Sequence, residues 1–405
     1  MPLSEKVIAR CLQISLFSEA PGEITRTFLC DAMHGCHRLL TAWMEELGMT
    51  VAVDPAGNLR GLYAGQGAVS RRLLIGSHLD TVPDAGMYDG VLGVVLGIAL
   101  VESLAGQRFS YEIEIAGFSE EEGVRFGVPF IGSRALAGTL DGAVLETTDE
   151  TAVSIRSAIS HFGLDPSRLD KGLLHPNTFA YLEFHIEQGP VLQSANQPLG
   201  IVERIAGQSR LTVQFNGRAA HAGATPMHQR RDALAAAAEW IVAVERHAAA
   251  VPGLVATVGR IEAKPGASNV IPASVMATLD VRHPFDEPRV EAVEKLLATA
   301  REIARRRGLR LAIEPKLDQN AVAMHSDLIH AAERAMQQGG FTAPRLVSGA
   351  GHDAMIIAAK IPSVMIFLRS PGGISHHPDE TVYPEDVSAA LLAGRHFLDE
   401  CERLS

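Results

Sequence analysis

The chain has 405 residues, which is long enough for a full hydrophobic core and favours two or three domains over a single small module. It carries 36 Lys and Arg against 47 Asp and Glu, a formal net charge of −11, and it contains no basic block. This balance disfavours a nucleic-acid or anionic-membrane partner and leaves small molecules as the expected ligands.

Two other features of the sequence bear on where the protein works. The N-terminus carries charges of both signs without the apolar stretch of a secretory signal, and the longest uncharged apolar run, 90–101, is too short to cross a bilayer. The four cysteines lack any CxxC pairing, which favours reduced thiols. We therefore expect a cytoplasmic protein.

The first half of the chain alternates helices and strands. Apolar spacing predicts helices over 5–17 and 36–47, then a strand from residue 51, a Pro/Gly turn and a second strand. The pattern continues with a strand over 72–77, a helix over about 90–105, a strand over 111–118 and a short strand over 181–185. This alternation is typical of a mostly parallel sheet with helices on both faces, whose ligands bind at the carboxyl ends of the strands.

The pattern changes near residue 208. From there it predicts a strand over 210–216, a helix over 231–248, strands over 254–261 and 274–283, a helix over 288–306 and a strand over 309–314. This βαββαβ order indicates a half-exposed antiparallel or mixed sheet with helices on one face. We therefore expect an α/β fold in which residues 1–207 and 321–405 form a discontinuous catalytic domain and 208–320 form an inserted α+β, ferredoxin-like domain.

Side chains that can bind metals gather near the predicted strand ends. Within 45 residues lie His78, Asp80, Asp89, Glu121 and Glu122, and His185 and His376 occupy similar loops further on. Taken alone, His78 and Asp80 are more typical of a local hydrogen-bonded pair. The whole set favours a two-metal hydrolytic site in which Asp89 is the natural bridge. Asp80 can then accept the other ring N–H of His78 and fix its tautomer.

The adjacent carboxylates of Glu121 and Glu122 suggest a division of labour. Two such anions raise each other's pKa unless a cation compensates their charge. One can bind a metal ion while the other takes a proton from the metal-bound water and later delivers it to a leaving nitrogen. The alternative is a solvated acidic turn from Glu120 to Glu122.

The motifs resemble those of a known enzyme family. They are Gly76-Ser-His-Leu-Asp-Thr-Val, Asp89-Gly, Ser119-Glu-Glu-Glu-Gly-Val-Arg-Phe, His185-Ile-Glu-Gln-Gly-Pro, Ala220-His-Ala-Gly-Ala-Thr-Pro-Met and Gly373-Ile-Ser-His. Their types and order resemble the M20 metallopeptidase superfamily, and more narrowly its amidase branch of allantoate amidohydrolases and N-carbamoyl-L-amino-acid hydrolases. The resemblance runs from about residue 75 to residue 380.

The resemblance implies a set of site residues and cofactors. It implies two divalent metal ions per subunit, Zn or Mn with Co or Ni also acceptable. One ion would be held by His78, Asp89 and His185, and the other by Glu122, His376 and the shared Asp89, with Glu121 as general base. Substrate would be bound by Gln188, His221, Asn269 and Arg282. In relatives the inserted domain also acts as a lid and makes the dimer contact, so a homodimer is expected.

The residue types suit these implied roles. His221 can donate to an oxyanion that develops on a ureido carbonyl. Arg282 can hold a carboxylate through two hydrogen bonds, although an arginine at a strand end is more often solvated or ion-paired. Arg369 is either a second anion contact or a surface arginine. We expect His352 and Asp353 to form a buried polar pair near the site and His377 to face outward.

These features together predict a metal-dependent amidohydrolase. It would cleave a linear ureido or N-carbamoyl amide of a small carboxylate, such as allantoate or an N-carbamoyl-L-amino acid, by metal-hydroxide attack with Glu121 as general base. The alternatives are a dipeptidase or aminoacylase of the same superfamily, or a catalytically silent metal-binding protein. Because a binding protein needs no free base beside its metal ligands, Glu121 argues against the silent alternative.

Overall fold

The computed structural model describes residues 1–66 and 71–403 of the chain. It divides into two compact units, Met1–Glu203 with Ala323–Ser405 and Arg204–Val322, and each is described by itself. None of the helices in the described part of the chain combines the length and apolar character that a membrane span requires.

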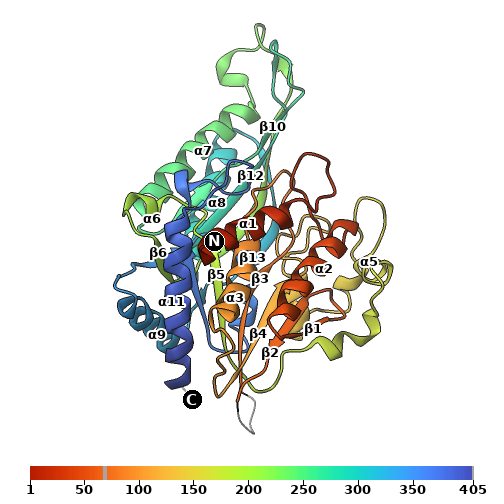
Figure 1. Ribbon diagram of the computed structural model, residues 1–405. Coiled ribbons are helices and arrows are strands. Elements are labelled where there is room, and N and C mark those ends of the chain that lie inside the picture. The colour runs from red at the N-terminus through yellow and green to blue at the C-terminus, as the bar shows by residue number, and fades with distance from the viewer. Residues whose placement is uncertain (67–70, 404–405) are drawn as a thin grey trace. The chain divides into compact units, whose positions relative to one another are not determined.

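The larger unit is built on a nine-stranded sheet (Figure 1), with strand order β1-β2-β4-β3-β5-β16-β6-β14 and β15 pairing with β6. Its centre consists of four parallel neighbours, β4 (Glu112–Phe118), β3 (Arg72–His78), β5 (Thr178–Ile186) and β16 (Ser363–Leu368). Nearly every residue of these strands is buried, as expected for parallel strands covered on both faces. The prediction of a mostly parallel α/β sheet is therefore confirmed.

Antiparallel strands flank this parallel centre. The hairpin expected from residue 51 is formed by β1 (Thr50–Val53) and β2 (Leu59–Tyr63), and β2 pairs antiparallel with β4. On the other side β6 (Leu199–Ile205) pairs antiparallel with β16. The short strands β14 (Val322–Ala323) and β15 (Arg345–Ser348) complete the sheet.

Helices of the larger unit cover this sheet. They are α1 (Leu3–Ser15), α2 (Asp31–Glu46), α3 (Val91–Ser103), α4 (Ile131–Leu136), α5 (Ile155–His161), α6 (Val191–Ser194), α9 (Ser326–Gln338), α10 (Asp353–Ile357) and α11 (Pro384–Arg403), with the 3₁₀ turns η1 (Val144–Glu146), η2 (Pro166–Gly172) and η4 (Pro371–Gly373). The apolar helix α3 packs on β3 and β5 and contacts α1 and α11 (Figure 1). Gly93 permits this close packing, because a Cβ atom there would lie 2.2 Å from the carbonyl oxygen of Phe184.

Helix α2 begins earlier than predicted. It starts at Asp31 instead of residue 36, and its buried face includes Met33, Cys36 and Leu40. Those positions continue the helical spacing toward the N-terminus, and Asp31 places a negative charge in the first turn, where the helix dipole favours it. The intervening polar His34 and the glycine at 35 obscured this extra turn in the sequence.

The smaller unit has a five-stranded antiparallel sheet with order β10-β12-β7-β13 and β9 beside β12. Its main elements are β7 (Gly207–Asn216), α7 (Ala233–Ala250), β12 (Ser274–His283), α8 (Asp286–Arg306) and β13 (Arg310–Gln319). Burial alternates along β12, and the buried side joins a core formed with α7 and α8. Trp240 Nε1 donates to the carbonyl oxygen of Leu296 at 3.0 Å and so links the two helices.

The strand predicted over 254–261 is interrupted. It forms β9 (Val255–Thr257) and β10 (Ile261–Lys264), both paired with β12. Thr257 pairs with Asp280 and Ile261 with Ala277, so three residues on one strand oppose two on the other, which is a β-bulge. A two-stranded sheet of β8 (Ala220–His221) and β11 (Val270–Ile271), and the turn η3 (Met227–Gln229), complete the unit.

Candidate metal centre

The candidate metal ligands come from neighbouring strands of the larger unit. His78 is the last residue of β3, the Glu120–Glu122 segment follows β4, His185 lies near the end of β5, and the loop that carries His376 follows β16. Because these four strands are parallel neighbours, their carboxyl ends meet at one edge of the sheet. Asp89 joins them from the loop before α3.

The first cluster consists of His78, Asp89 and His185, all buried. Asp89 Oδ1 lies 3.1 Å from His185 Nε2 and 3.7 Å from His78 Nε2, and the two Nε2 atoms are 3.4 Å apart. Each ring places Nδ1 against a backbone carbonyl oxygen, of Asp80 at 3.0 Å for His78 and of Ile186 at 2.9 Å for His185. A carbonyl oxygen only accepts, so Nδ1 carries the hydrogen and a neutral ring presents its Nε2 lone pair to Asp89.

This convergence of electron pairs fits a cation. Among the described residues, Asp89 Oδ1 is buried and accepts no hydrogen bond of good geometry. Two imidazole nitrogens and a carboxylate oxygen are the donors that Zn²⁺ and related ions prefer. Burial opposes ionisation of Asp89, but contact with the three histidines outweighs it and lowers the pKa of the Asp89 carboxyl well below its usual range.

The second cluster shares Asp89. His376 Nε2 lies 3.2 Å from Asp89 Oδ2 and 3.3 Å from Glu122 Oε1. Asp89 thus presents one carboxylate oxygen to each cluster, as a bridging ligand does. Hydrogen bonds to Asp89 and Glu122 raise the pKa of His376 to about 10. His376 holds a left-handed backbone, with φ of 55°, a conformation that favours glycine and that functional sites often retain.

The Glu120–Glu122 segment is held by Asp80. The Asp80 carboxylate accepts the backbone N–H of Glu121 at 2.9 Å and that of Glu122 at 3.1 Å. Its Oδ1 is 3.4 Å from His78 Nδ1, farther than the Asp80 carbonyl oxygen, so the nearer contact that orients the ring comes from the main chain. Glu120 and Glu121 are buried and Glu122 is half-buried, which contradicts the alternative of a solvated acidic turn.

Glu121 lies close to the ligands without being in either cluster above. Its carboxylate, with His78 and Glu122, forms a third set of atoms close enough to hold an ion. Burial raises the pKa of Glu121 well above its usual range, Glu122, Asp353 and Asp80 add to the rise, and His78 opposes it. A group with a raised pKa beside metal ligands suits proton transfer near neutral pH.

The structure brings one of the four predicted substrate-binding residues to these clusters. Gln188 Nε2 donates to Asp89 Oδ2 at 3.0 Å and to Ser375 Oγ at 3.2 Å, and the residue has a left-handed backbone with φ of 58°. The other three belong to the smaller unit. There the Ala222 N–H donates to the Asn269 carbonyl oxygen at 2.9 Å, so Asn269, just before β11, lies beside the end of β8, which carries His221.

The exposed His221 and the half-buried Arg282 have defined local partners. His221 Nδ1 accepts the Gly223 N–H at 3.1 Å, which leaves the ring hydrogen of a neutral imidazole on Nε2. Arg282 donates to the Asp280 carboxylate at 2.8 and 3.0 Å. Within the smaller unit, Arg282 is therefore an ion-paired arginine, as expected for an arginine at a strand end.

The remaining residues singled out in the sequence are also accounted for. His352 and Asp353 are both buried, and the His352 ring lies 4.4 Å from that of His185, as expected for a polar pair near the site. His377 has an exposed side chain. Arg369 donates to Asp386 at 2.8 and 2.7 Å and stacks on Tyr383, so its guanidinium is paired within the larger unit.

Two buried carboxylates were missed in the sequence. Glu183 accepts hydrogen bonds from Ser77, Tyr181 and the Ala354 N–H, and a charged residue inside an otherwise apolar strand was the signal that could have revealed it.

Glu380 accepts the backbone N–H groups of Tyr88 and Asp89, at 2.8 and 3.0 Å. Burial and the nearby Asp89 raise the pKa of Glu380 to about 7. Its position four residues after His376 was a weaker signal.

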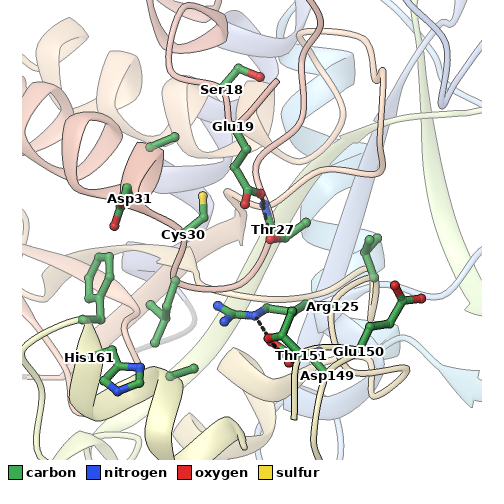
Figure 2. Close-up of a pocket in the computed structure, with 15 residues that line it drawn as sticks. Ser18, Glu19, Thr27, Cys30, Asp31, Arg125, Asp149, Glu150, Thr151 and His161 are labelled. Carbon is green, nitrogen blue, oxygen red and sulfur yellow. Dashed lines mark hydrogen bonds and ion pairs between the residues drawn. The ribbon is translucent and has the colours of Figure 1, made fainter. Parts of the chain in front are cut away.

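A separate pocket of about 870 Å³ lies elsewhere in the larger unit (Figure 2). Its lining includes Glu19, Asp31, Glu150 and an ion pair in which Arg125 Nε donates to Asp149 at 2.9 Å. Arg125 also donates to the Phe28 carbonyl oxygen, so its guanidinium is already engaged. The predicted metal and substrate residues do not line this pocket, and we place the candidate centre at the His and carboxylate clusters.

Comparison with known proteins defines the class. The model of peptidase family M20/M25/M40 matches residues 74–400, and the chain belongs to this family, whose enzymes are metal-dependent. The resemblance predicted from the motifs is confirmed.

Its relatives narrow the class to amidohydrolases. Allantoate deiminase 2 of Glycine max is 40% identical, with 98% of this chain and 89% of the relative covered. N-carbamoyl-L-amino acid amidohydrolase of Geobacillus stearothermophilus is 40% identical, with 96% of each covered. The crystal structure of an amidase of the hydantoinase/carbamoylase family from Burkholderia multivorans is 31% identical, has a TM-score of 0.91, and covers 98% of this chain and 97% of its own.

Proposed function

We propose that the chain is a metal-dependent amidohydrolase that cleaves a linear ureido or N-carbamoyl amide of a small carboxylate, either allantoate or an N-carbamoyl-L-amino acid. The observation that carries this proposal is Asp89, which presents one oxygen to each of two His and carboxylate clusters. The names of the relatives at 40% identity support the substrate class. They do not favour a dipeptidase or an aminoacylase.

We propose two divalent ions, Zn or Mn, as cofactors. His78, Asp89 and His185 would hold one, and Glu122 and His376 would hold the other together with Asp89. When bound, such ions act as Lewis acids that polarise the substrate carbonyl and lower the pKa of the attacking water.

The proton would be handled by Glu121. Its carboxylate would take a proton from the attacking water and later deliver it to the leaving nitrogen, which the raised pKa of the group favours. The backbone N–H of Glu121 is held by Asp80, so the base has a defined position beside the ligands.

Four residues would bind the substrate. Gln188 would hydrogen-bond the amide or ureido group, and its Nε2 already donates to Asp89. His221 would donate its Nε2 hydrogen to the carbonyl oxygen as negative charge develops there, and Asn269 would bind a second polar group of the substrate. Arg282 would hold the substrate carboxylate by two hydrogen bonds.

We propose the catalytic role for residues 1–207 with 321–405 and a lid and dimerisation role for residues 208–320. The βαββαβ succession of the smaller unit supports a ferredoxin-like description. Its edge strand β13 offers backbone groups to a second copy, and a sedimentation measurement of molecular mass tests the homodimer. The four cysteines are buried free thiols, which supports a cytoplasmic location.

Ammonia release from ureido and carbamoyl substrates, and release of free amino acid from the comparison substrates, test the function. Metal-depleted protein is reconstituted separately with Zn²⁺ and Mn²⁺ and offered allantoate, 3-ureidopropionate and several N-carbamoyl-L-amino acids, with dipeptides and N-acetyl amino acids as comparison substrates. We expect turnover of one or more ureido or carbamoyl compounds that a chelator abolishes. Faster cleavage of the comparison substrates, or ammonia release that resists the chelator, would contradict the proposal.

A further inference from the structure

Glu380 lies where two ligand-bearing segments meet. Its Oε1 accepts the backbone N–H of Tyr88 at 2.8 Å and that of Asp89 at 3.0 Å. Its Oε2 lies 3.3 Å from Ser375 Oγ, the hydroxyl next to His376 in the sequence. The side chain is 3% exposed. One buried carboxylate therefore contacts the main chain of the shared ligand and the neighbour of the last ligand.

Ser375 closes this arrangement. Its hydroxyl lies within hydrogen-bond distance of both Glu380 Oε2 and Asp89 Oδ2, the latter at 3.1 Å. The same Asp89 oxygen lies 3.2 Å from His376 Nε2. The contacts of Glu380 thus reach Asp89 by two routes, through its backbone N–H and through the Ser375 hydroxyl.

The loop before Asp89 makes room for this carboxylate. A Cβ atom on Gly86 would lie 2.4 Å from both Cβ and Oε1 of Glu380, closer than real Cβ contacts. The backbone of Gly86 lies outside the left-handed region, so space and not conformation requires glycine there. The loop Ala85-Gly-Met-Tyr is therefore shaped around Glu380.

We propose that Glu380 is a positioning residue of the metal centre. Its carboxylate fixes the Asp89 main chain and the Ser375 hydroxyl, and so keeps Asp89 and His376 in the positions in which both bind the same ion. The oxygens of Glu380 are directed to N–H and O–H donors, which distinguishes it from the ligands. Hydrogen bonds from two amides to one carboxylate are stronger than neutral ones. This inference rests on the proposed two-metal function.

Metal affinity is the measurement that tests the inference. Chelator-competition titrations of metal-free protein with Zn²⁺ or Mn²⁺ give the dissociation constant of each binding step. In Glu380→Ala we expect the dissociation constant of the weaker-bound ion to rise by about 10–100-fold, which is the usual effect of losing a partner that orients a ligand. Glu380→Gln keeps a side-chain oxygen that can accept both N–H groups, and we expect it to keep most of the metal affinity of the wild type.

Two further variants separate positioning from general stability. Gly86→Ala displaces the carboxylate without removing it, and we expect the same selective loss of affinity. Glu400→Ala is the matched control, because Glu400 is also buried and joins α11 to Arg334 and Gln338 of α9 at 2.6 and 2.8 Å. It should lower the melting temperature of the metal-free protein and leave both dissociation constants unchanged.

The outcomes distinguish this inference from the function on which it rests. Dissociation constants of Glu380→Ala within twofold of the wild type, or an equal loss in Glu400→Ala, overturn the positioning role while the metal function stands. Wild-type protein that binds neither ion overturns both. If Glu380→Ala does not fold, Gly86→Ala decides: unchanged affinity overturns the role and a selective loss supports it.

Discussion

Replacing Glu121 with glutamine should remove turnover and leave the metal ions in place. The substitution keeps the size of a buried side chain, and it leaves the main-chain contact in which the Asp80 carboxylate accepts the residue 121 N–H, at 2.9 Å in the wild type. Burial already raises the pKa of Glu121, so a neutral amide is tolerated there. A general base contributes about 10²–10⁴-fold to the rate, which corresponds to about 3–5 kcal/mol at 1.36 kcal/mol for each factor of ten.

The assay compares kcat and metal content in the same preparation of Glu121→Gln. Its matched control is Glu122→Gln, one residue away, which removes a proposed ligand and should lower metal content as well as turnover. If Glu121→Gln retains kcat within fivefold of the wild type, the role of general base is wrong. If it loses an ion together with activity, Glu121 belongs to the ligand set that it forms with His78 and Glu122.

Four other outcomes are expected. His78→Ala and His376→Ala should each lower the number of bound ions, measured by elemental analysis, and full occupancy in either would contradict its ligand role. A chelator should lower the melting temperature, because a site filled at 100 times its dissociation constant adds about 2.7 kcal/mol to stability. Arg282→Ala should raise KM for a carboxylate substrate by about 10–100-fold with little change in kcat, since a hydrogen-bonded charge contributes about 1.5–3 kcal/mol. Burial, then the charges of His34 and Arg26, lower the pKa of His37 from 6.5 to about 4. The stability contributed by neutral His37 is therefore complete above pH 6.5 and is lost as the pH falls toward 4, a loss of about 3 kcal/mol at 1.36 kcal/mol per pH unit. Urea unfolding should show a smaller loss for His37→Gln over this range, and equal losses would refute the assignment.

The sequence predicted the parallel sheet because its signal is local. Apolar runs such as 73–75 and 364–368 are continuous, and buried parallel strands require that composition. The positions of His78 and His185 near strand ends follow from the same pattern, since each stands where an apolar run stops. The motifs then supplied the order of the ligand-type residues along the chain.

Contacts made through the main chain could not be predicted in this way. The Asp80 carboxylate binds the N–H groups of residues 121 and 122, more than 40 positions away, and those donors are the same for any residue type. Glu380 binds N–H groups 291 and 292 positions distant. The bulge between β9 and β10 depends likewise on pairing with β12, which the sequence of 254–261 does not encode alone.

The contacts around Asp89 show how the chain prepares this cluster for a cation. Two imidazole nitrogens 3.4 Å apart and a buried carboxylate oxygen without a hydrogen bond among the described residues present electron pairs to one another. Burial of such groups costs stability unless neighbouring groups compensate it, as the three histidines do for the Asp89 carboxylate. The surrounding hydrogen bonds keep these atoms in place. The carbonyl oxygens of Asp80 and Ile186 fix the ring tautomers, and the Glu380 carboxylate fixes the Asp89 main chain. A cation that binds this cluster finds its ligand atoms already oriented, so the same contacts prepare the chain for metal-dependent hydrolysis.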